Sequence, residues 1–185
     1  MKWGISIPIL VAVVAVVFFV ITGVWSTEDQ EEVSEDTVIK ENAMRDGGDV
    51  GAMSSRGVSY YGNVLAENGN GVFLLDFNRS DYENALMNED LVVLYFYASW
   101  CPICRVEFPR MQEAFRMLDA HGVVGFRVNY NDSDTDEFEK GLAREHGVAY
   151  QHTKVFIRNG EQVLKSPESW KTDRYLKEIN NALAQ

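Results

Sequence analysis

The amino-terminal part of the chain carries a long run of apolar residues without a charge. It extends from Ile5 to Trp25 (ISIPILVAVVAVVFFVITGVW), and its roughly 21 residues, at about 1.5 Å each, can span a hydrocarbon core about 30 Å thick. Lys2 precedes the run and acidic residues such as Glu28 follow it, which is typical of a helix whose amino terminus stays in the cytoplasm. We therefore expect a single-pass transmembrane helix in residues 1–25 and an extracytoplasmic domain, on the periplasmic or extracellular side. A cleaved signal peptide is the alternative, although its apolar region usually has only about 7–15 residues.

The next segment, residues 26–56, has little apolar content and no sustained periodicity. Its acidic residues outnumber its basic ones, a composition that favours an acidic, flexible linker. A coil of about 30 residues has an end-to-end distance near 30 Å, so the domain beyond it can reach partners close to a membrane surface. We expect that folded domain to occupy residues 57–185.

Downstream of the linker, strand-like and helix-like patterns alternate. Leu91–Tyr97 (LVVLYFY) is a continuous apolar run rich in β-branched and aromatic residues, which predicts a strand buried on both faces. Residues 101–118 follow with apolar side chains such as Phe108 at helical spacing, and Pro109 is expected to kink this helix. The alternation predicts one α/β domain with a central mixed β-sheet flanked by helices on both faces. The other expected strands are residues 58–66, 72–77, 123–130, 153–158 and 162–165, and the other expected helices are residues 81–88, with Ser80 as the cap, 135–145 and 171–183.

Charge and cysteine content narrow the range of functions. The chain has 17 basic and 28 acidic residues and a formal net charge of −11, which argues against a nucleic-acid partner, because binding a phosphate backbone needs clustered Lys and Arg. Only two cysteines occur, and they form one Cys-x-x-Cys, so neither a disulfide framework nor a four-cysteine zinc site can hold the domain together. The pair therefore acts as a redox couple, as part of a metal site completed by histidine, or as a structural bridge.

The cysteine pair opens the helix that follows the buried strand. Backbone N–H groups and the helix dipole favour an anion there, so we expect an exposed Cys101 that ionises readily and acts as the nucleophile. Cys104 lies about one turn further on, is expected to be more buried, and can resolve a mixed disulfide. Pro102 fits the first helical position because its missing N–H would have no intrahelical partner. Trp100 is expected to shield the sulfur atoms and to offer an apolar contact surface.

The residues around the cysteines resemble a known family. Ala98 to Cys104 (ASWCPIC) is similar to the active-site segment of the thioredoxin superfamily, and the following RVEFP extends the match to the Cys-x-x-Cys-x-x-Glu-x-Pro pattern of membrane-anchored TlpA/ResA-like thioredoxins. Residues 146–153 (HGVAYQHT) resemble the family's segment that ends in cis-Pro-Thr, with Thr153 at the threonine. The resemblance implies the thioredoxin fold, a Glu107 that tunes the cysteines, and no cofactor beyond a redox-active Cys101–Cys104 disulfide. The partners it implies are protein thiol or disulfide substrates and an upstream electron donor.

Two residues depart from the family pattern. Tyr95 stands where thioredoxin has a buried Asp that assists proton transfer, opposite Arg127 rather than Lys, so Glu107, Tyr95 or water has to serve as the base. His152 stands at the cis-proline position, where we expect a trans peptide bond because a cis bond before a non-proline residue costs about 3–4 kcal/mol. Beside the sulfur atoms, the His152 ring can stabilise the Cys101 thiolate as an imidazolium, bind a metal ion, or only satisfy local backbone groups.

These features together predict a thiol–disulfide oxidoreductase that acts on disulfides of exported proteins, as a reductant in preference to an oxidant. A Sco-like copper-delivery protein with Cys101, Cys104 and His152 as ligands is the alternative, although such proteins usually have Cys-x-x-x-Cys spacing. A further alternative is a non-catalytic, membrane-tethered adaptor that binds a partner through an apolar rim around Trp100, Tyr150 and His152.

Overall fold

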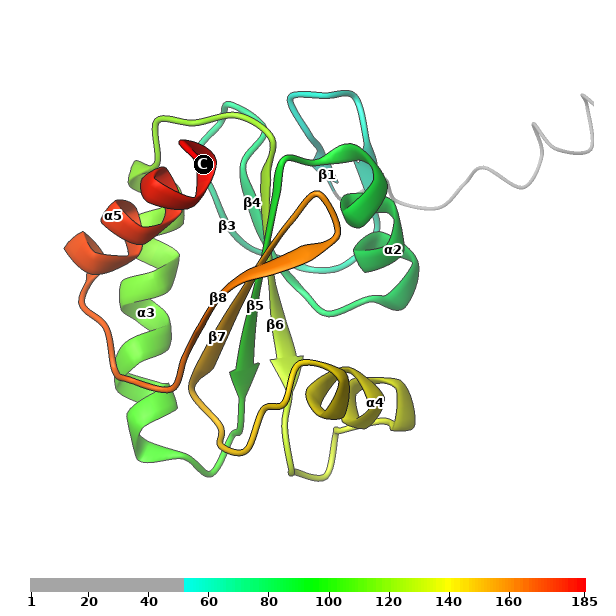
Figure 1. Cartoon of the computed structure of the whole chain (residues 1–185), viewed down its shortest axis with the longest axis vertical. Coiled ribbons are helices and arrows are strands. Elements are labelled where there is room, and N and C mark those ends of the chain that lie inside the picture. The colour runs from blue at the N-terminus through cyan, green and yellow to red at the C-terminus, as the bar shows by residue number, and fades with distance from the viewer. Residues whose placement is uncertain (1–51) are drawn as a thin grey trace, which may run out of the picture. The chain divides into compact units, whose positions relative to one another are not determined.

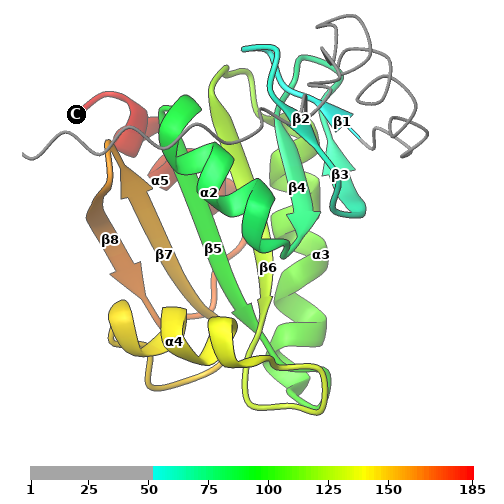
Figure 2. The same cartoon turned by 90° about the vertical axis from the view of Figure 1, so that its right-hand side faces the viewer.

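A mixed six-stranded sheet forms the centre of residues 52–185, which are the residues that the computed structural model describes (Figures 1 and 2). Its strands are β3 (Val64–Glu67), β4 (Phe73–Asp76), β5 (Leu91–Tyr97), β6 (Val123–Asn129), β7 (Thr153–Arg158) and β8 (Glu161–Ser166), in the spatial order β3-β4-β6-β5-β7-β8. β6 pairs in parallel with both β4 and β5, whereas β5 and β7 are antiparallel. The hairpins β3–β4 and β7–β8 form the two edges. The predicted mixed sheet is confirmed.

Helices cover both faces of this sheet and create two apolar cores. α3 (Pro102–Met117) and α5 (Thr172–Leu183) pack on one face, and α2 (Arg79–Asn88) and α4 (Glu137–Glu145) lie on the other (Figure 1). The central strand β5 contributes to both cores, with its even-numbered residues Val92 to Phe96 on the α2/α4 side and its odd-numbered residues Leu91 to Tyr95 on the α3/α5 side. Burial on both faces explains why the sequence of β5 is apolar throughout rather than alternating.

The strand expected over residues 58–66 is wrong, because the chain breaks there into two elements. β2 (Ser59–Tyr60) pairs with β1 (Ala52–Met53) in a separate two-stranded sheet, and β3 begins only at Val64. The N–H groups of Tyr61 and Gly62 donate to one carboxylate oxygen of Asp81 in α2, at 2.9 and 2.7 Å. Since these donors are taken by a side chain, they are not free for a strand neighbour.

The expected cap of α2 is also wrong by two residues. Asn78, not Ser80, is the N-cap: its backbone is extended, and its side-chain oxygen accepts the N–H groups of Ser80 and Asp81 at 3.0 and 3.3 Å. Asparagine and serine are comparably good caps, so the local sequence alone did not distinguish the two positions.

The described domain starts earlier than residue 57. β1 lies in the segment expected to be linker, and Arg56 forms an ion pair with Asp90, directly before β5. Residues 52–56 therefore pack with the folded domain. The predicted transmembrane helix, residues 1–25, and most of the predicted linker lie outside the described residues. Among the helices that are described, none combines the length and the apolar character needed to cross a membrane.

Gly125 is required where β6 passes beneath α3. A Cβ atom at this position would lie 2.5 Å from the Phe115 ring and 2.9 Å from Leu74, both fully buried. We expect Gly125→Ala to lower the free energy of unfolding by about 1–3 kcal/mol, measured by urea denaturation, because the packed core has to shift. Gly141→Ala in α4 is the matched control: its Cβ would have only Arg144 within 4 Å, at 3.9 Å, so we expect a gain of up to about 1 kcal/mol. Equal effects of the two substitutions would contradict this account of the packing.

Candidate active site

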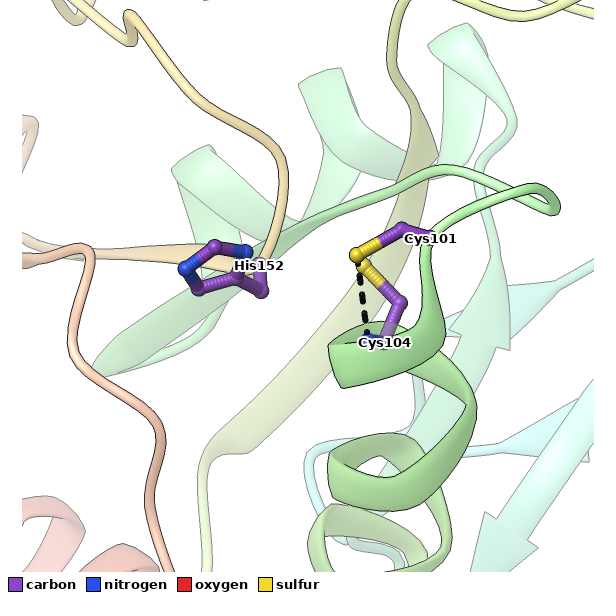
Figure 3. Close-up of side chains that lie close together, drawn as sticks. All are labelled: Cys101, Cys104 and His152. Atoms are coloured by element: carbon purple, nitrogen blue, oxygen red, sulfur yellow. Dashed lines mark hydrogen bonds between the residues drawn. The ribbon is translucent and has the colours of Figure 1, made fainter.

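The cysteine pair lies where β5 ends and α3 begins. Cys101 is the N-cap of α3, Pro102 is its first residue, and the Cys101 sulfur accepts the backbone N–H of Cys104 at 3.3 Å (Figure 3). Both cysteines are free thiols. The structure thus confirms that the pair opens this helix, in the position where unsatisfied N–H groups and the helix dipole favour a thiolate.

Both sulfur-bearing residues are buried, which corrects the expectation of an exposed Cys101. Cys101 is 1% exposed and Cys104 0%. Cys101 packs with Ala98 and Cys104 in a small buried cluster. The exposed residues of the site are its neighbours Trp100 and Ile103, at 50% and 45%.

Burial also determines the protonation state of Cys104. Burial raises the pKa of the Cys104 thiol to about 11, although the backbone at Ala98 acts in the opposite direction. At neutral pH Cys104 is therefore protonated, and it can attack only after losing its proton. This agrees with a thiol that acts second in an exchange reaction.

His152 faces the sulfur atoms from the loop that leads into β7. A ring nitrogen of His152 and both sulfur atoms all lie within 4.8 Å of one another (Figure 3). The described residues contain no cis peptide bond, which confirms the trans bond expected before His152, but the residue takes a left-handed backbone conformation with φ of +56°. Its N–H donates to the Phe96 carbonyl at 2.6 Å, and the hydroxyl of the next residue, Thr153, donates to the Tyr150 carbonyl at 2.7 Å.

The electrostatic surroundings favour a neutral imidazole. Burial and the positive charge of Lys154 lower the pKa of His152. Its Nδ1 atom is buried and has no hydrogen-bond partner among the described residues. An imidazolium that stabilises the Cys101 thiolate is therefore disfavoured, and a neutral ring with an available lone pair is favoured.

A buried ion pair lies below the cysteines and ties four segments together. The Nζ atom of Lys154 in β7 donates to the Glu107 carboxylate in α3 at 2.7 Å, and both side chains are fully buried. The same oxygen, Oε1, accepts the Trp170 backbone N–H at 3.0 Å and the Tyr175 hydroxyl at 2.7 Å. Lys154 also donates to the carbonyls of His152, at 2.9 Å, and Glu168. Glu107 is therefore an integral part of the core, not a solvated helix residue.

Sequence reasoning missed Lys154. The available signal was a lysine directly before the apolar residues VFI of an expected strand. A lysine in such a position needs a buried anion, and Glu107 was already a candidate.

Three other predicted support residues are Tyr95, Arg127 and Trp100. Tyr95 is fully buried, and its hydroxyl has no hydrogen-bond partner in the described region. Burial raises the pKa of Tyr95 well above its usual value, so it stays neutral and does not act as a base. Arg127 pairs with Tyr95 along the β-ladder, but its guanidinium is bound to Asp76 at 2.5 Å and stacks over the Tyr97 and Phe108 rings. Trp100 is held by a hydrogen bond from its ring N–H to the Asn131 carbonyl at 3.0 Å.

Comparison with known proteins now identifies the family. A model of the AhpC/TSA family matches residues 73–156, from β4 into β7. Thioredoxin H4 of Arabidopsis thaliana is 30% identical over 120 residues, which cover 65% of this chain and 91% of that protein. The chain belongs to the thioredoxin superfamily.

A second relative covers less of this chain, and a solved structure shows the same fold. A protein disulfide-isomerase of Medicago sativa is 31% identical over 90 residues, 48% of this chain but 17% of that protein, so the chain spans less than a fifth of such relatives. The crystal structure of thioredoxin from Aeropyrum pernix has 20% identity and a TM-score of 0.50, over 65% of this chain and 93% of that one. The thioredoxin fold is thus confirmed, while the narrower TlpA/ResA-like assignment stays a prediction.

Removing the buried lysine tests how strongly the fold depends on the ion pair. We expect Lys154→Met to lower the free energy of unfolding by about 3–5 kcal/mol, because it leaves the Glu107 charge buried without its partner. Lys140→Met is the matched control: Lys140 pairs with Glu137 at the same 2.7 Å, but at the surface, so its loss should cost at most about 1 kcal/mol. Urea denaturation measures both.

A double substitution separates the lost charge pair from lost packing. Adding Glu107→Gln to Lys154→Met removes the uncompensated charge and keeps an oxygen for Trp170 and Tyr175. The double variant should therefore be more stable than Lys154→Met alone. If it is not, the loss at Lys154 arises from packing and not from charge.

Proposed function

We propose that this protein exchanges protein disulfides through Cys101 and Cys104. The observation that carries the proposal is the pair of free thiols at the start of α3, with the Cys101 sulfur accepting the Cys104 N–H. A sulfur in this position gains stability as a thiolate from the helix terminus, and the thiolate is the attacking species in disulfide exchange.

The reaction proceeds in two steps. The Cys101 thiolate attacks one sulfur of a substrate disulfide, which forms a mixed disulfide and releases the other substrate sulfur as a thiolate. Cys104 then gives up its proton and attacks the Cys101 sulfur, which closes the Cys101–Cys104 disulfide and releases the second substrate thiolate. Two electrons pass from the protein to the substrate, and an external dithiol donor returns the pair to its reduced form.

Glu107 supplies a buried carboxylate that can take part in the second step. Its Oε1 is occupied by three donors, whereas its buried Oε2 has no hydrogen-bond partner among the described residues. Glu107 follows Cys104 by three residues on the buried face of α3, one turn away. This arrangement supports Glu107, in preference to the neutral Tyr95, as the group that receives or relays the proton of Cys104.

The substrate docks on the apolar rim of the site. Trp100, Ile103 and Val106 are 50%, 45% and 58% exposed next to a Cys101 that is almost inaccessible, so docking has to displace part of this rim before the sulfurs meet.

The finer part of the proposal is that the substrates are exported proteins, that the protein acts as a reductant, and that a helix in residues 1–25 holds it in the membrane. The apolar run and the net acidic segment after it support this location.

Single cysteine substitutions in the full chain test the proposal. With dithiothreitol as the donor and insulin as the substrate, we expect Cys101→Ser and Cys104→Ser both to reduce turnover to the uncatalysed background. Only Cys104→Ser should accumulate a mixed disulfide with the substrate, visible on a non-reducing gel, because Cys101 can still attack but nothing resolves the product.

Met117→Ser, at the far and exposed end of α3, is the control and should keep full turnover. Full turnover in Cys101→Ser would refute the oxidoreductase proposal. A partner that still binds the Cys101→Ser chain would then favour the adaptor alternative.

A further inference from the structure

The two cysteines and His152 form a compact set of soft ligands. Within residues 52–185, Sγ of Cys101, Sγ of Cys104 and a ring nitrogen of His152 are mutually within 4.8 Å, and they come from the start of α3 and from the loop before β7 (Figure 3). Zinc binds thiolate sulfur at about 2.3 Å and imidazole nitrogen at about 2.0–2.1 Å, so tetrahedral ligands are about 3.5–3.8 Å apart. The three groups therefore need to close by only about 1 Å around an ion.

A second observation points independently to a ligand. Nδ1 of His152 is buried and has no hydrogen-bond partner among the described residues. An unsatisfied buried polar atom of this kind costs about 1–3 kcal/mol, and coordination to a metal ion would satisfy it. The His152 ring lies beside two sulfur atoms that bind the same class of metal ion.

The backbone holds the His152 ring in place. The residue has φ of +56°, a strained conformation for a non-glycine residue. Its N–H is fixed by the Phe96 carbonyl at 2.6 Å, and its own carbonyl by the buried Lys154 ammonium at 2.9 Å. A ligand that is fixed from both sides of its backbone loses little conformational freedom when a metal ion binds.

The chemistry of the set selects the ion. Two thiolates and one imidazole are soft or borderline ligands that suit Zn²⁺ and Cu⁺ and not Mg²⁺ or Ca²⁺, which prefer oxygen. The nearby carboxylate, Glu107, is already bound to Lys154 at 2.7 Å. We propose that the reduced protein binds one soft d¹⁰ metal ion, Zn²⁺ or Cu⁺, through Cys101, Cys104 and His152.

This site goes beyond disulfide exchange and competes with it. Sulfur atoms joined in a disulfide are no longer thiolates, so only the reduced pair binds the ion. Three protein ligands leave one coordination position of a tetrahedral ion open to water or to an incoming thiol.

Metal binding to the full, reduced chain tests the proposal. Zn²⁺ alone is titrated against a chromogenic chelator, and Co²⁺ is used as a spectroscopic substitute. We expect one ion per chain, and with Co²⁺ a thiolate charge-transfer band together with the visible bands of a tetrahedral site. In a parallel arm, Cu⁺ is titrated against a Cu⁺-specific chelator, and the ion retained against the stronger competition is the one the site prefers.

His152→Asn is the decisive variant because asparagine tolerates a positive φ and so preserves the loop. Loss of a residue that only supports a metal ligand typically weakens binding about 10–100-fold, so loss of the His152 ligand should weaken it by about 100-fold or more. His121→Asn, at an exposed histidine, is the matched control and should bind as the parent chain does.

Three outcomes overturn the proposal: neither ion binds, His152→Asn binds as tightly as the parent chain, or His121→Asn loses binding to the same extent. Insulin reduction by the His152→Asn chain, measured in the presence of a chelator, keeps the two proposals separate. If the His152→Asn chain reduces insulin but does not bind metal, the oxidoreductase proposal holds and the substitution has affected only the metal site.

Discussion

The ion pair between Lys154 and Glu107 is the interaction on which the geometry of the site depends. It joins the helix that carries the cysteines to the strand that follows His152, and through Trp170 and Tyr175 it also binds α5 and the segment before it. Lys154 donates to three acceptors and Oε1 of Glu107 accepts three donors. Burying two charges costs several kcal/mol for each ion, which their attraction and hydrogen bonds largely offset. We infer that the pair fixes positions more than it adds net stability.

One lysine therefore links the two halves of the candidate active site. Its ammonium group contacts the carboxylate three residues after Cys104 and also the carbonyl of His152, so α3 and the loop before β7 cannot move independently. Members of the superfamily with the cis-proline hold this loop by a covalent ring constraint. Here a histidine with a positive φ takes its place, and hydrogen bonds at its N–H and its carbonyl replace that constraint. The substitution exchanges a chemically inert residue for one with a lone pair.

The sequence predicted those parts of the fold that depend on local pattern. β5 and β7 were predicted with their observed bounds because continuous apolar runs mark buried strands, and the helix after the cysteines follows from its 3.6-residue spacing. Features that depend on distant partners were not predicted. Asp81 interrupts the expected strand over residues 58–66 from 19 residues away, and Lys154 meets Glu107 across 47 residues. The burial of Cys101 likewise follows from its packing in the folded domain, which spacing does not reveal. The likeness to thioredoxins supplied His152 and Glu107.

The ends of the described chain and the thiols lie at opposite ends of the domain, along the direction of the strands. Ser55 and Arg56 are bound to Gly122 and Asp90, which directly precede β6 and β5, and the last turn of α5 is bound through Ala182 to Arg158 at the end of the antiparallel β7. Both ends of residues 52–185 thus lie at one pole, and the thiols lie at the other, beyond the carboxyl end of β5 (Figure 2). Seven residues of strand, at about 3.3 Å each, separate the poles by more than about 20 Å. A segment attached before residue 52 or after residue 185 is therefore joined to the domain at the end opposite the thiols.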